Sequence, residues 1–358
     1  MFAYVGGYTT PDRDGRGNGI NVYRVDEVSG GWTHLQNIDG LENPSLFTLN
    51  RASTRLYSVH GGRKLISAFA IDRRTGALTL LNQVDCQGSN PVDSALDPTE
   101  RYLVIANYGS GAVAVMPIDQ DGRLLPVSQV IPLEGTPGPN PKEQASSHPH
   151  AVIFDPTGQF VIVPDKGFDR TFFFRFHDGV LTPTEQRHVD SAAGAAPRHT
   201  TFHPSLPVLY VNNELDSTVT VFDWTAGRAT ERQVVSTVPQ GHAQGSTGGD
   251  AGPNTTAEIA ASPSGRYLYV SNRGLDSIVQ FVVTPGSGLL TYAGSVSSGG
   301  AKPRFFTLGP RGKHLYAANQ DSDDITVFHV DQESGTLIPT GIQVSVGSPS
   351  AISFVTPP

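Results

Sequence analysis

The sequence predicts an all-β protein, a seven-bladed β-propeller with four antiparallel strands in each blade. Three observations carry this prediction. A seven-residue strand pattern recurs along the whole chain, turn signatures flank most of its copies, and no stretch has a convincing helical period. Four-stranded units that repeat around an axis leave only short, protected sheet edges. We therefore expect one propeller domain over residues 1–358.

The recurring pattern is an apolar, β-branched and aromatic strand that ends on a small or polar residue. Its copies start 47 to 59 residues apart. The copies are MFAYVGG (1–7), TRLYSVH (54–60), RYLVIAN (101–107), QFVIVPD (159–165), PVLYVNN (207–213), RYLYVSN (266–272) and KHLYAAN (313–319). This spacing predicts equivalent units that differ mainly in the length of their loops.

The elements of each unit follow one order along the chain. A short innermost strand comes first, as in PSLFTL (44–49), and a D-P-x-G-like turn such as FDPTGQ (154–159) leads into the recurring strand. A tight turn and a third strand follow, as in LDSTVTVFDW (215–224), and a shorter unit such as GALTLLNQV (76–84) completes the blade. Each blade is therefore predicted to run from the axis outward.

The two ends of the chain predict how the ring closes. The N-terminal FAYVGGY (2–8) has no innermost strand before it, whereas the C-terminal PSAISFV (349–355) resembles an innermost strand. We expect one blade built from both ends. Two Gly/Pro/Ser-rich insertions, 133–147 and 238–256, precede innermost strands and should reach the same rim, where long loops commonly carry or cover a site.

Composition excludes several classes of function. The net charge is −8 and no Lys/Arg-rich run occurs, so we expect no nucleic-acid partner. Cys86 is the single cysteine, which excludes an intramolecular disulfide. The chain has no apolar run of 18 residues and no signal-peptide pattern, so we expect no membrane partner and a cytoplasmic location. The oligomeric state is left open.

Function in a propeller concentrates where equivalent positions differ, because packing positions must stay alike. The residues after the recurring strand are Tyr8, Gly61, Tyr108, Lys166, Glu214, Arg273 and Gln320. Two successive positions near the start of the innermost strands carry Ser45/Leu46, Val92/Asp93, His150/Ala151, Arg198/His199, Ala257/Glu258 and Arg304/Phe305. Both sets should fall at one end of the central channel. Charged groups there must be paired or used, and perturbed titration is expected.

Structural roles remain open for several of these residues. Glu214 could instead form a salt bridge to Lys166 or Arg273. Arg198 and Arg304 could instead bind backbone carbonyls of neighbouring blades. His199 follows Arg198 directly and should face the other side of its strand as a packed or hydrogen-bonded histidine. Structural or loop positions are also expected for His60, His148, His203 and the turn residues Asp165, Asp169, Asp216 and Asp276.

Metal and cofactor sites are not indicated. No H-x-x-x-H or C-x-x-C motif lies on a suitable element, and the pair His148 and His150 has low specificity by itself. No G-x-S-x-G elbow occurs, and no G-x-G-x-x-G follows a strand and opens a helix. We therefore expect neither a metal nor a cofactor.

A set of ordered motifs resembles one known family along essentially the whole chain. These motifs are NPSLFTL, ANYGSGAVAV, HPHAVIFDPTGQFVIVPDKGFDR, APRHTTFHP, YVNNELDSTVTV, AEIAASPSGRYLYVSNRGLDSI and PRFFTLGPRGKHLYAANQDSDDITVF. The family is that of the seven-bladed-propeller lactonases. It includes bacterial propeller-type 6-phosphogluconolactonases and the fungal 3-carboxy-cis,cis-muconate lactonizing enzyme, a cycloisomerase.

The resemblance implies four cleft residues, and the comparison of equivalent positions selects the same four: His150, Arg198, Glu214 and Arg273. Arg304 and Gln320 also match family positions. We expect substrate contacts from Arg304, Gln320, Lys166, Tyr8, Tyr108 and Glu258. The chain departs from the pattern at Asp93, where some relatives have a histidine, and this leaves the exact substrate open.

The expected function is hydrolysis of a small anionic or sugar-derived lactone, 6-phosphogluconolactone-like or unphosphorylated. Glu214 or His150 would act as the base that activates water, and Arg198 and Arg273 would stabilise the oxyanion and bind an anionic group. Two alternatives remain. The same groups suit a muconate-type cycloisomerase, and a propeller can also act as a non-catalytic scaffold for protein partners.

Overall fold

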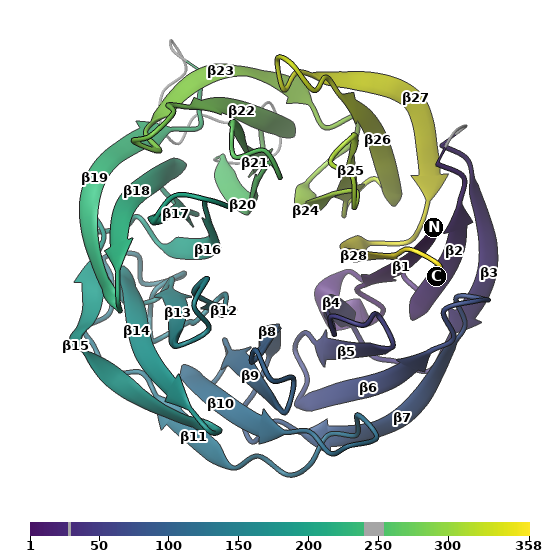
Figure 1. The fold of residues 1–358 in the computed structure, drawn as a ribbon, viewed down its shortest axis with the longest axis horizontal. Coiled ribbons are helices and arrows are strands. Elements are labelled where there is room, and N and C mark those ends of the chain that lie inside the picture. The colour runs from purple at the N-terminus through teal and green to yellow at the C-terminus, as the bar shows by residue number, and fades with distance from the viewer. Residues whose placement is uncertain (28–29, 240–253) are drawn as a thin grey trace.

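The protein is a ring of seven four-stranded antiparallel sheets around a central axis (Figure 1), as the repeat predicts. The computed structural model describes residues 1–27, 30–239 and 254–358. Within these ranges the only helix is the 3₁₀ turn η1 (Pro11–Arg13), so none is long and apolar enough to cross a membrane. Most of the insertion at 238–256 lies outside the described residues.

Each blade runs from an innermost strand to an outermost one. The innermost strands are β28 (Pro349–Val355), β4 (Pro44–Leu49), β8 (Pro91–Leu96), β12 (Ile153–Phe154), β16 (Pro197–Phe202), β20 (Thr255–Ala261) and β24 (Pro303–Leu308). The second strands, which are the recurring pattern, are β1 (Phe2–Gly7), β5 (Arg55–His60), β9 (Tyr102–Asn107), β13 (Phe160–Asp165), β17 (Val208–Asn213), β21 (Tyr267–Arg273) and β25 (His314–Asn319).

Two further strands complete each blade. The third strands are β2 (Ile20–Val25), β6 (Leu65–Ile71), β10 (Ala112–Pro117), β14 (Arg170–His177), β18 (Thr218–Thr225), β22 (Ser277–Val283) and β26 (Asp324–Val330). The outermost strands are β3 (Trp32–Ile38), β7 (Leu78–Asp85), β11 (Gln129–Pro132), β15 (Val180–Asp190), β19 (Arg228–Ser236), β23 (Leu290–Ser297) and β27 (Leu337–Ser345).

The expectation that the outermost unit is shorter is wrong for most blades, since β15 has 11 residues and β19 has 9. Alternate residues of an outermost strand face solvent and are mostly polar. The apolar pattern therefore marks only half of the strand's residues and makes the strand look shorter than it is. The innermost strand expected at 150–154 is also shorter than predicted, because β12 includes two residues. His150 is nevertheless held beside β13 by its backbone N–H, which donates to the carbonyl oxygen of Pro164 at 3.0 Å.

The hydrophobic core lies between the blades. β17 is buried at every position, because a neighbouring blade covers each of its faces, whereas β23 alternates half-buried and exposed residues after its buried first residue. A typical core cluster joins Tyr57 and Ile66 of one blade to Leu103 and Met116 of the next. Each fully buried side chain of this kind contributes about 1.5–3 kcal/mol. Packing between blades therefore rigidifies the ring that positions the channel residues.

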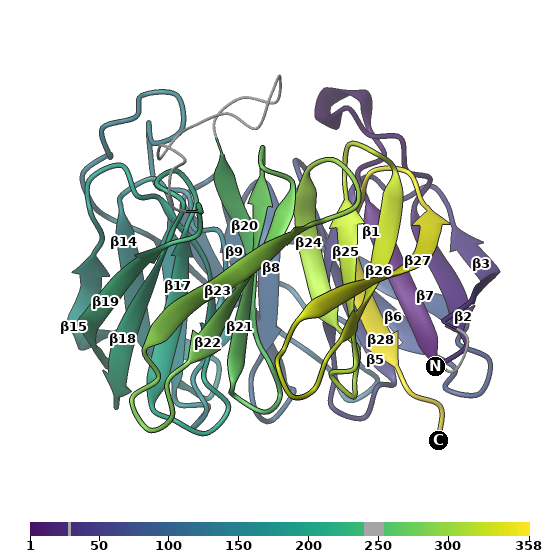
Figure 2. The same ribbon diagram turned by 90° about the horizontal axis from the view of Figure 1, so that it is seen from above.

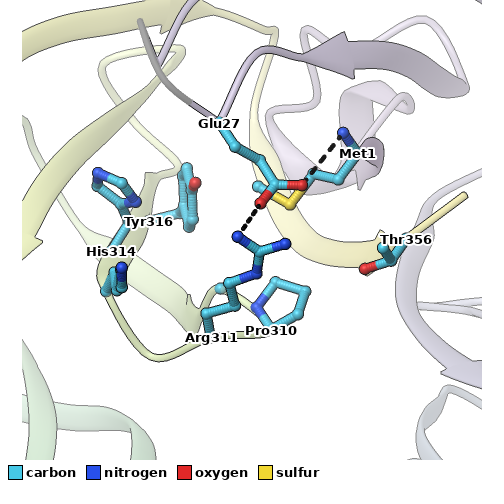
Figure 3. A pocket seen from close by; sticks show the side chains of 9 residues that line it. Met1, Glu27, Pro310, Arg311, His314, Tyr316 and Thr356 are labelled. Carbon is cyan, nitrogen blue, oxygen red and sulfur yellow. Dashed lines mark ion pairs between the residues drawn. The ribbon is translucent and has the colours of Figure 1, made fainter.

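The two ends of the chain close the ring as expected. β28 pairs with β1 from Phe2 opposite Val355 to Gly7 opposite Pro349. Both termini lie at the same face of the ring (Figure 2). A cavity of about 270 Å³ lies at this seam, where Glu27 forms an ion pair with Arg311 at 3.4 Å. Figure 3 shows the side chains that line this cavity. It lies at the start of β1 and β25, at the opposite end of these strands from Tyr8 and Gln320.

A repeated hydrogen bond between blades explains why tyrosine recurs in the second strand. The buried hydroxyls of Tyr4, Tyr57, Tyr210 and Tyr269 each donate to a glycine carbonyl in the outer turn of the next blade, at 2.7–3.2 Å. We expect Tyr269→Phe to lower the free energy of unfolding by about 1–2 kcal/mol, because the Gly335 carbonyl is left unpaired. Denaturant titration measures this. A comparable loss in Tyr292→Phe, on the outermost strand β23, would contradict it.

Candidate active site

A β-bulge at the start of several innermost strands turns two successive side chains toward the channel. Pro197 lies opposite Asn213 and His199 opposite Asn212, so Arg198 is the extra residue, with no residue opposite it on β17. β4, β8 and β24 shift register at the same place. Such an extra residue bends the strand and locally abolishes the alternation of its faces. The expectation that His199 faces away from Arg198 is therefore wrong, since both line one cavity.

Two adjoining cavities occupy this end of the channel. The first, which we name the mouth cavity, has a volume of about 140 Å³ and is lined by Tyr8, Arg13, Asn90, Val92, Tyr108, His150, Lys166, Glu214, Arg273 and Arg304. The second, which we name the channel cavity, has a volume of about 20 Å³ and is lined by Tyr8, Ser45, Leu46, Val92, His150, Arg198, His199, Arg304, Phe305 and Ser350. Several residues line both cavities, so the two cavities lie next to each other.

Glu214 is the centre of a buried charge cluster. It follows β17, and its Oε1 lies 2.8 Å from Lys166 Nζ and 3.3 Å from Arg273 Nη2, while its Oε2 lies 3.0 Å from Arg198 Nε. Burial by itself would raise the pKa of Glu214, but Arg273, Lys166 and Arg198 hold it well below its usual range. Glu214 is therefore ionised and engaged at both oxygen atoms.

The cations of this cluster are fixed by further contacts. Arg198 is 2% exposed and its Nη1 donates to the backbone carbonyl of Ala257 in the next blade, so the inter-blade role left open for Arg198 is real. Arg273 Nη2 donates to the carbonyl of Thr256 at 2.8 Å. Burial, Arg273 and Arg304 lower the pKa of Arg198 to about 9. Arg304 binds no neighbouring carbonyl within the described ranges.

The insertion at 133–147 reaches this rim, as expected. Glu143 Oε2 accepts a hydrogen bond from Lys166 Nζ at 2.7 Å, and the Gln144 side chain donates to the Lys166 carbonyl at 2.9 Å. Lys166 is thus held between Glu143 of the insertion and Glu214 of the next blade. Coulomb attraction to Glu214 outweighs burial and raises the pKa of Lys166, so the amine stays charged.

His150 and His148 have different environments. The His150 ring lines both cavities, and its buried Nδ1 has no hydrogen-bond partner among the residues that the structure describes. Burial and the charges of nearby cations, Arg198 first among them, hold the pKa of His150 well below its usual range, so the ring is neutral. His148 instead stacks on Tyr108 at 4.4 Å between ring centroids and donates from Nδ1 to the Tyr108 carbonyl, which fits the expected loop role.

A second histidine lies deeper in the channel. His199 Nδ1 is 3.1 Å from Glu258 Oε1, and its ring centroid is 5.2 Å from that of His150. Asp93 lines neither cavity. Its carboxylate accepts the backbone N–H of Val152 at 2.8 Å, and burial raises the pKa of Asp93 to about 7. Asp93 therefore ties two blades together beneath the cavities.

Comparison with known proteins shows which family this chain resembles. Residues 2–354 match the family described as "Lactonase, 7-bladed beta-propeller". The chain belongs to this lactonase family. It is 35% identical over 309 residues to the 6-phosphogluconolactonase of Bacillus subtilis, which spans 85% of this chain and 83% of the relative. It is 32% identical to the periplasmic gluconolactonase of Pseudomonas aeruginosa, with a TM-score of 0.90 over 100% of this chain and 99% of the other.

The lactonase brings most of its predicted site residues together. The cavities are lined by His150, Arg198, Glu214, Arg273, Arg304, Lys166, Tyr8 and Tyr108. Two predicted substrate contacts are not among the lining residues. Glu258 binds His199 instead, and Gln320 is 7% exposed at the rim, where its backbone carbonyl accepts Arg16 Nη2 at 2.9 Å.

Arg13 was not among the residues predicted from the sequence of this lactonase. It belongs to η1, in a long connection between β1 and β2 that lies outside the repeated strand pattern. Its guanidinium carbon lies 5.7 Å from the centroid of the Tyr8 ring, and that of Arg304 lies 5.4 Å from the same ring. Neither guanidinium has an ion pair or hydrogen bond within the described ranges. The length of this first connection was the available signal.

Proposed function

We propose that this lactonase hydrolyses a sugar-derived lactone, with 6-phosphogluconolactone as its preferred substrate. The observation that carries the proposal is the charge of the mouth cavity, which is lined by Arg13, Lys166, Arg273 and Arg304 against the one carboxylate of Glu214. A cation-rich cavity attracts an anionic substrate and stabilises an oxyanion. The names of the Bacillus and Pseudomonas relatives point to sugar lactones.

The proposed reaction is attack of water on the ring ester. Arg273, at the wall of the mouth cavity, stabilises the oxyanion that forms on the carbonyl oxygen. Glu214 holds Arg273, Lys166 and Arg198 in place, and its depressed pKa makes it a poor proton acceptor. A neutral histidine of the cavities is therefore the better base. This assigns Glu214 an anchoring role in place of the base role considered from the sequence.

The pair of unengaged guanidinium groups on Tyr8 suits a phosphate. Arg13 and Arg304 contact the same ring, and two arginines can bind a phosphate through several charge-assisted hydrogen bonds. We expect Arg13→Gln to raise KM for 6-phosphogluconolactone by about 10-fold, the value of roughly 1.4 kcal/mol of binding. KM for gluconolactone, which has no phosphate for Arg13 to bind, should change by less than about 2-fold. Equal changes for the two lactones would remove Arg13 from a phosphate site.

The proposed function is tested by assaying the opening of both lactones against the spontaneous reaction. Rapid opening of 6-phosphogluconolactone supports it. Turnover of a carboxymuconate without turnover of either lactone would select the cycloisomerase. Silence in both assays, with a stoichiometric protein partner in pull-downs, would select the scaffold. Burying charged groups costs free energy. A scaffold would gain nothing from that cost, so it has no need of the buried cluster around Glu214.

Two coarser features of the protein complete the proposal. We propose that residues 1–358 act as one propeller domain, because the blade that closes the ring takes strands from both ends of the chain. We also propose a cytoplasmic location, although a similar protein from Pseudomonas aeruginosa is named periplasmic. Cell fractionation decides between the two compartments.

A further inference from the structure

The channel cavity has the size of one water molecule and adjoins the space for the substrate. A buried cavity needs about 10–15 Å³ to hold a water, and the channel cavity has about 20 Å³. Polar groups of His150, His199 and Arg304 line it, so such a water has hydrogen-bond partners. A lactone does not fit there, whereas the mouth cavity of about 140 Å³ is larger and shares His150 and Arg304 with it.

His199 lines the channel cavity, and the contact of its Nδ1 shows which ring nitrogen carries the proton. Its Nδ1 lies 3.1 Å from Glu258 Oε1, and a carboxylate oxygen accepts a hydrogen bond from a ring N–H, so the proton is assigned to Nδ1. The Nε2 atom is then unprotonated, and no hydrogen bond to it occurs in the part of the chain that the structure describes. The backbone N–H of His199 donates to Asn212 Oδ1 at 2.9 Å, which fixes the residue further.

The other candidate bases are less suited to accept a proton. Glu214 is engaged by three cations at 2.8–3.3 Å. His150 is near cations, and within the described residues its buried Nδ1 has no carboxylate partner to stabilise an imidazolium. His199 alone among these groups combines an open nitrogen with a carboxylate partner on its other nitrogen. That arrangement orients an imidazole and stabilises its protonated form.

We propose that His199, oriented by Glu258, is the general base that activates a water held in the channel cavity. This inference rests on the proposed lactone hydrolysis. The water oxygen bonds to the lactone carbonyl carbon while His199 Nε2 takes one water proton. The carbonyl carbon–ring oxygen bond then breaks, and the ring oxygen leaves as a hydroxyl that takes the proton back from His199. The products are a hydroxy acid and the neutral base.

The surroundings of His199 set the pH range in which it acts. Glu258 of β20, Arg198 of its own strand and Arg304 of β24 act on its charge. The His150 ring lies beside it, and Asp93 of β8 lies near Glu258. Burial lowers the pKa of His199 below 6.5 against the opposing effect of Glu258. The base form is therefore present at neutral pH, and kcat should fall only on the acid side of pH 6.5.

The test uses the full chain with His199→Gln and Glu258→Gln. We expect His199→Gln to lower kcat by about 10²–10⁴-fold with little change in KM, the usual effect of removing a general base. Glu258→Gln keeps an acceptor for Nδ1–H but removes the charge that favours the imidazolium. Its kcat should fall by about 10-fold or more, and the acid limb of its pH profile should move to lower pH.

His60→Gln is the control, because both His60 nitrogens are engaged, by the Glu42 carbonyl and Ser67 Oγ at 2.6 Å, and His60 lines neither cavity. Its kcat should stay at the wild-type level. A folded His199→Gln variant with wild-type kcat would overturn the inference. The inference would also be overturned if Glu258→Gln is slow but the acid limb of its pH profile does not move. This second outcome can be measured even if His199→Gln fails to fold. A wild-type protein that opens no lactone would instead overturn the proposed function itself.

Discussion

Replacing Glu214 with Gln should abolish measurable lactone opening and lower the free energy of unfolding by about 3–5 kcal/mol, the cost of leaving buried charges without a partner. Lys166, Arg198 and Arg273 all lie within 3.3 Å of its carboxylate, and their side chains are at most 11% exposed. Gln has the same size but no charge. The cations would then repel one another and move from their positions around the mouth cavity.

The pH dependence of this loss follows from the depressed pKa of Glu214. A carboxylate whose pKa is lower in the folded state stabilises the fold above its unfolded pKa, here near 4.5. That stabilisation is lost only as pH falls through the folded pKa, which lies well below 4.5. The difference between wild type and Glu214→Gln should therefore be full at neutral pH and shrink only in strong acid.

Denaturant titration at pH 7 measures the effect, and Glu143→Gln is the matched control. Glu143 also contacts Lys166, at 2.7 Å, but its side chain is 34% exposed against 9% for Glu214. A partly exposed ion pair contributes about 0–1 kcal/mol. We expect Glu143→Gln to remain active and nearly as stable as wild type. Equal losses in the two variants would show that burial of Glu214 is not what makes the cluster important.

The second large effect is expected for Arg273→Gln, which should lower kcat by about 10²–10³-fold, as removal of one oxyanion donor does in hydrolases. Arg273 lines the mouth cavity, and its Nη2 is positioned by the Thr256 carbonyl and by Glu214. Arg273→Lys should recover only part of the rate, because an ammonium cannot reproduce the planar fork of donors.

Steady-state kinetics separates this role from a structural one. If Arg273 acts on the transition state, kcat and kcat/KM should fall together, whereas a loss of binding that is equal in the ground state and the transition state raises KM with kcat unchanged. Arg16→Gln is the control, since Arg16 forms an exposed ion pair with Asp323 at 2.6 Å and lines neither cavity. A wild-type kcat in Arg273→Gln would mean that another group stabilises the oxyanion.

The difference between what was predictable and what was not is clearest at the start of β16. The equivalence of Arg198 with Arg304 and His150 could be read from the repeat. The orientation of His199 could not, because it depends on a bulge between Pro197 and His199 that strand alternation does not anticipate. Gln320 shows the opposite error, since an equivalent position in the repeat did not make it a lining residue.

The blades, their order and the closure of the ring were predictable from the amino-acid sequence. Those features follow from local alternation, turn residues and periodic spacing, which every unit repeats. How the charges combine depends on the packing of the blades against one another. Lys166, Glu214 and Arg273 come from different blades, and whether Glu214 is a base or an anchor depends on the distances between them. The pairing of His199 with Glu258, 59 residues apart, likewise exists only once neighbouring blades pack.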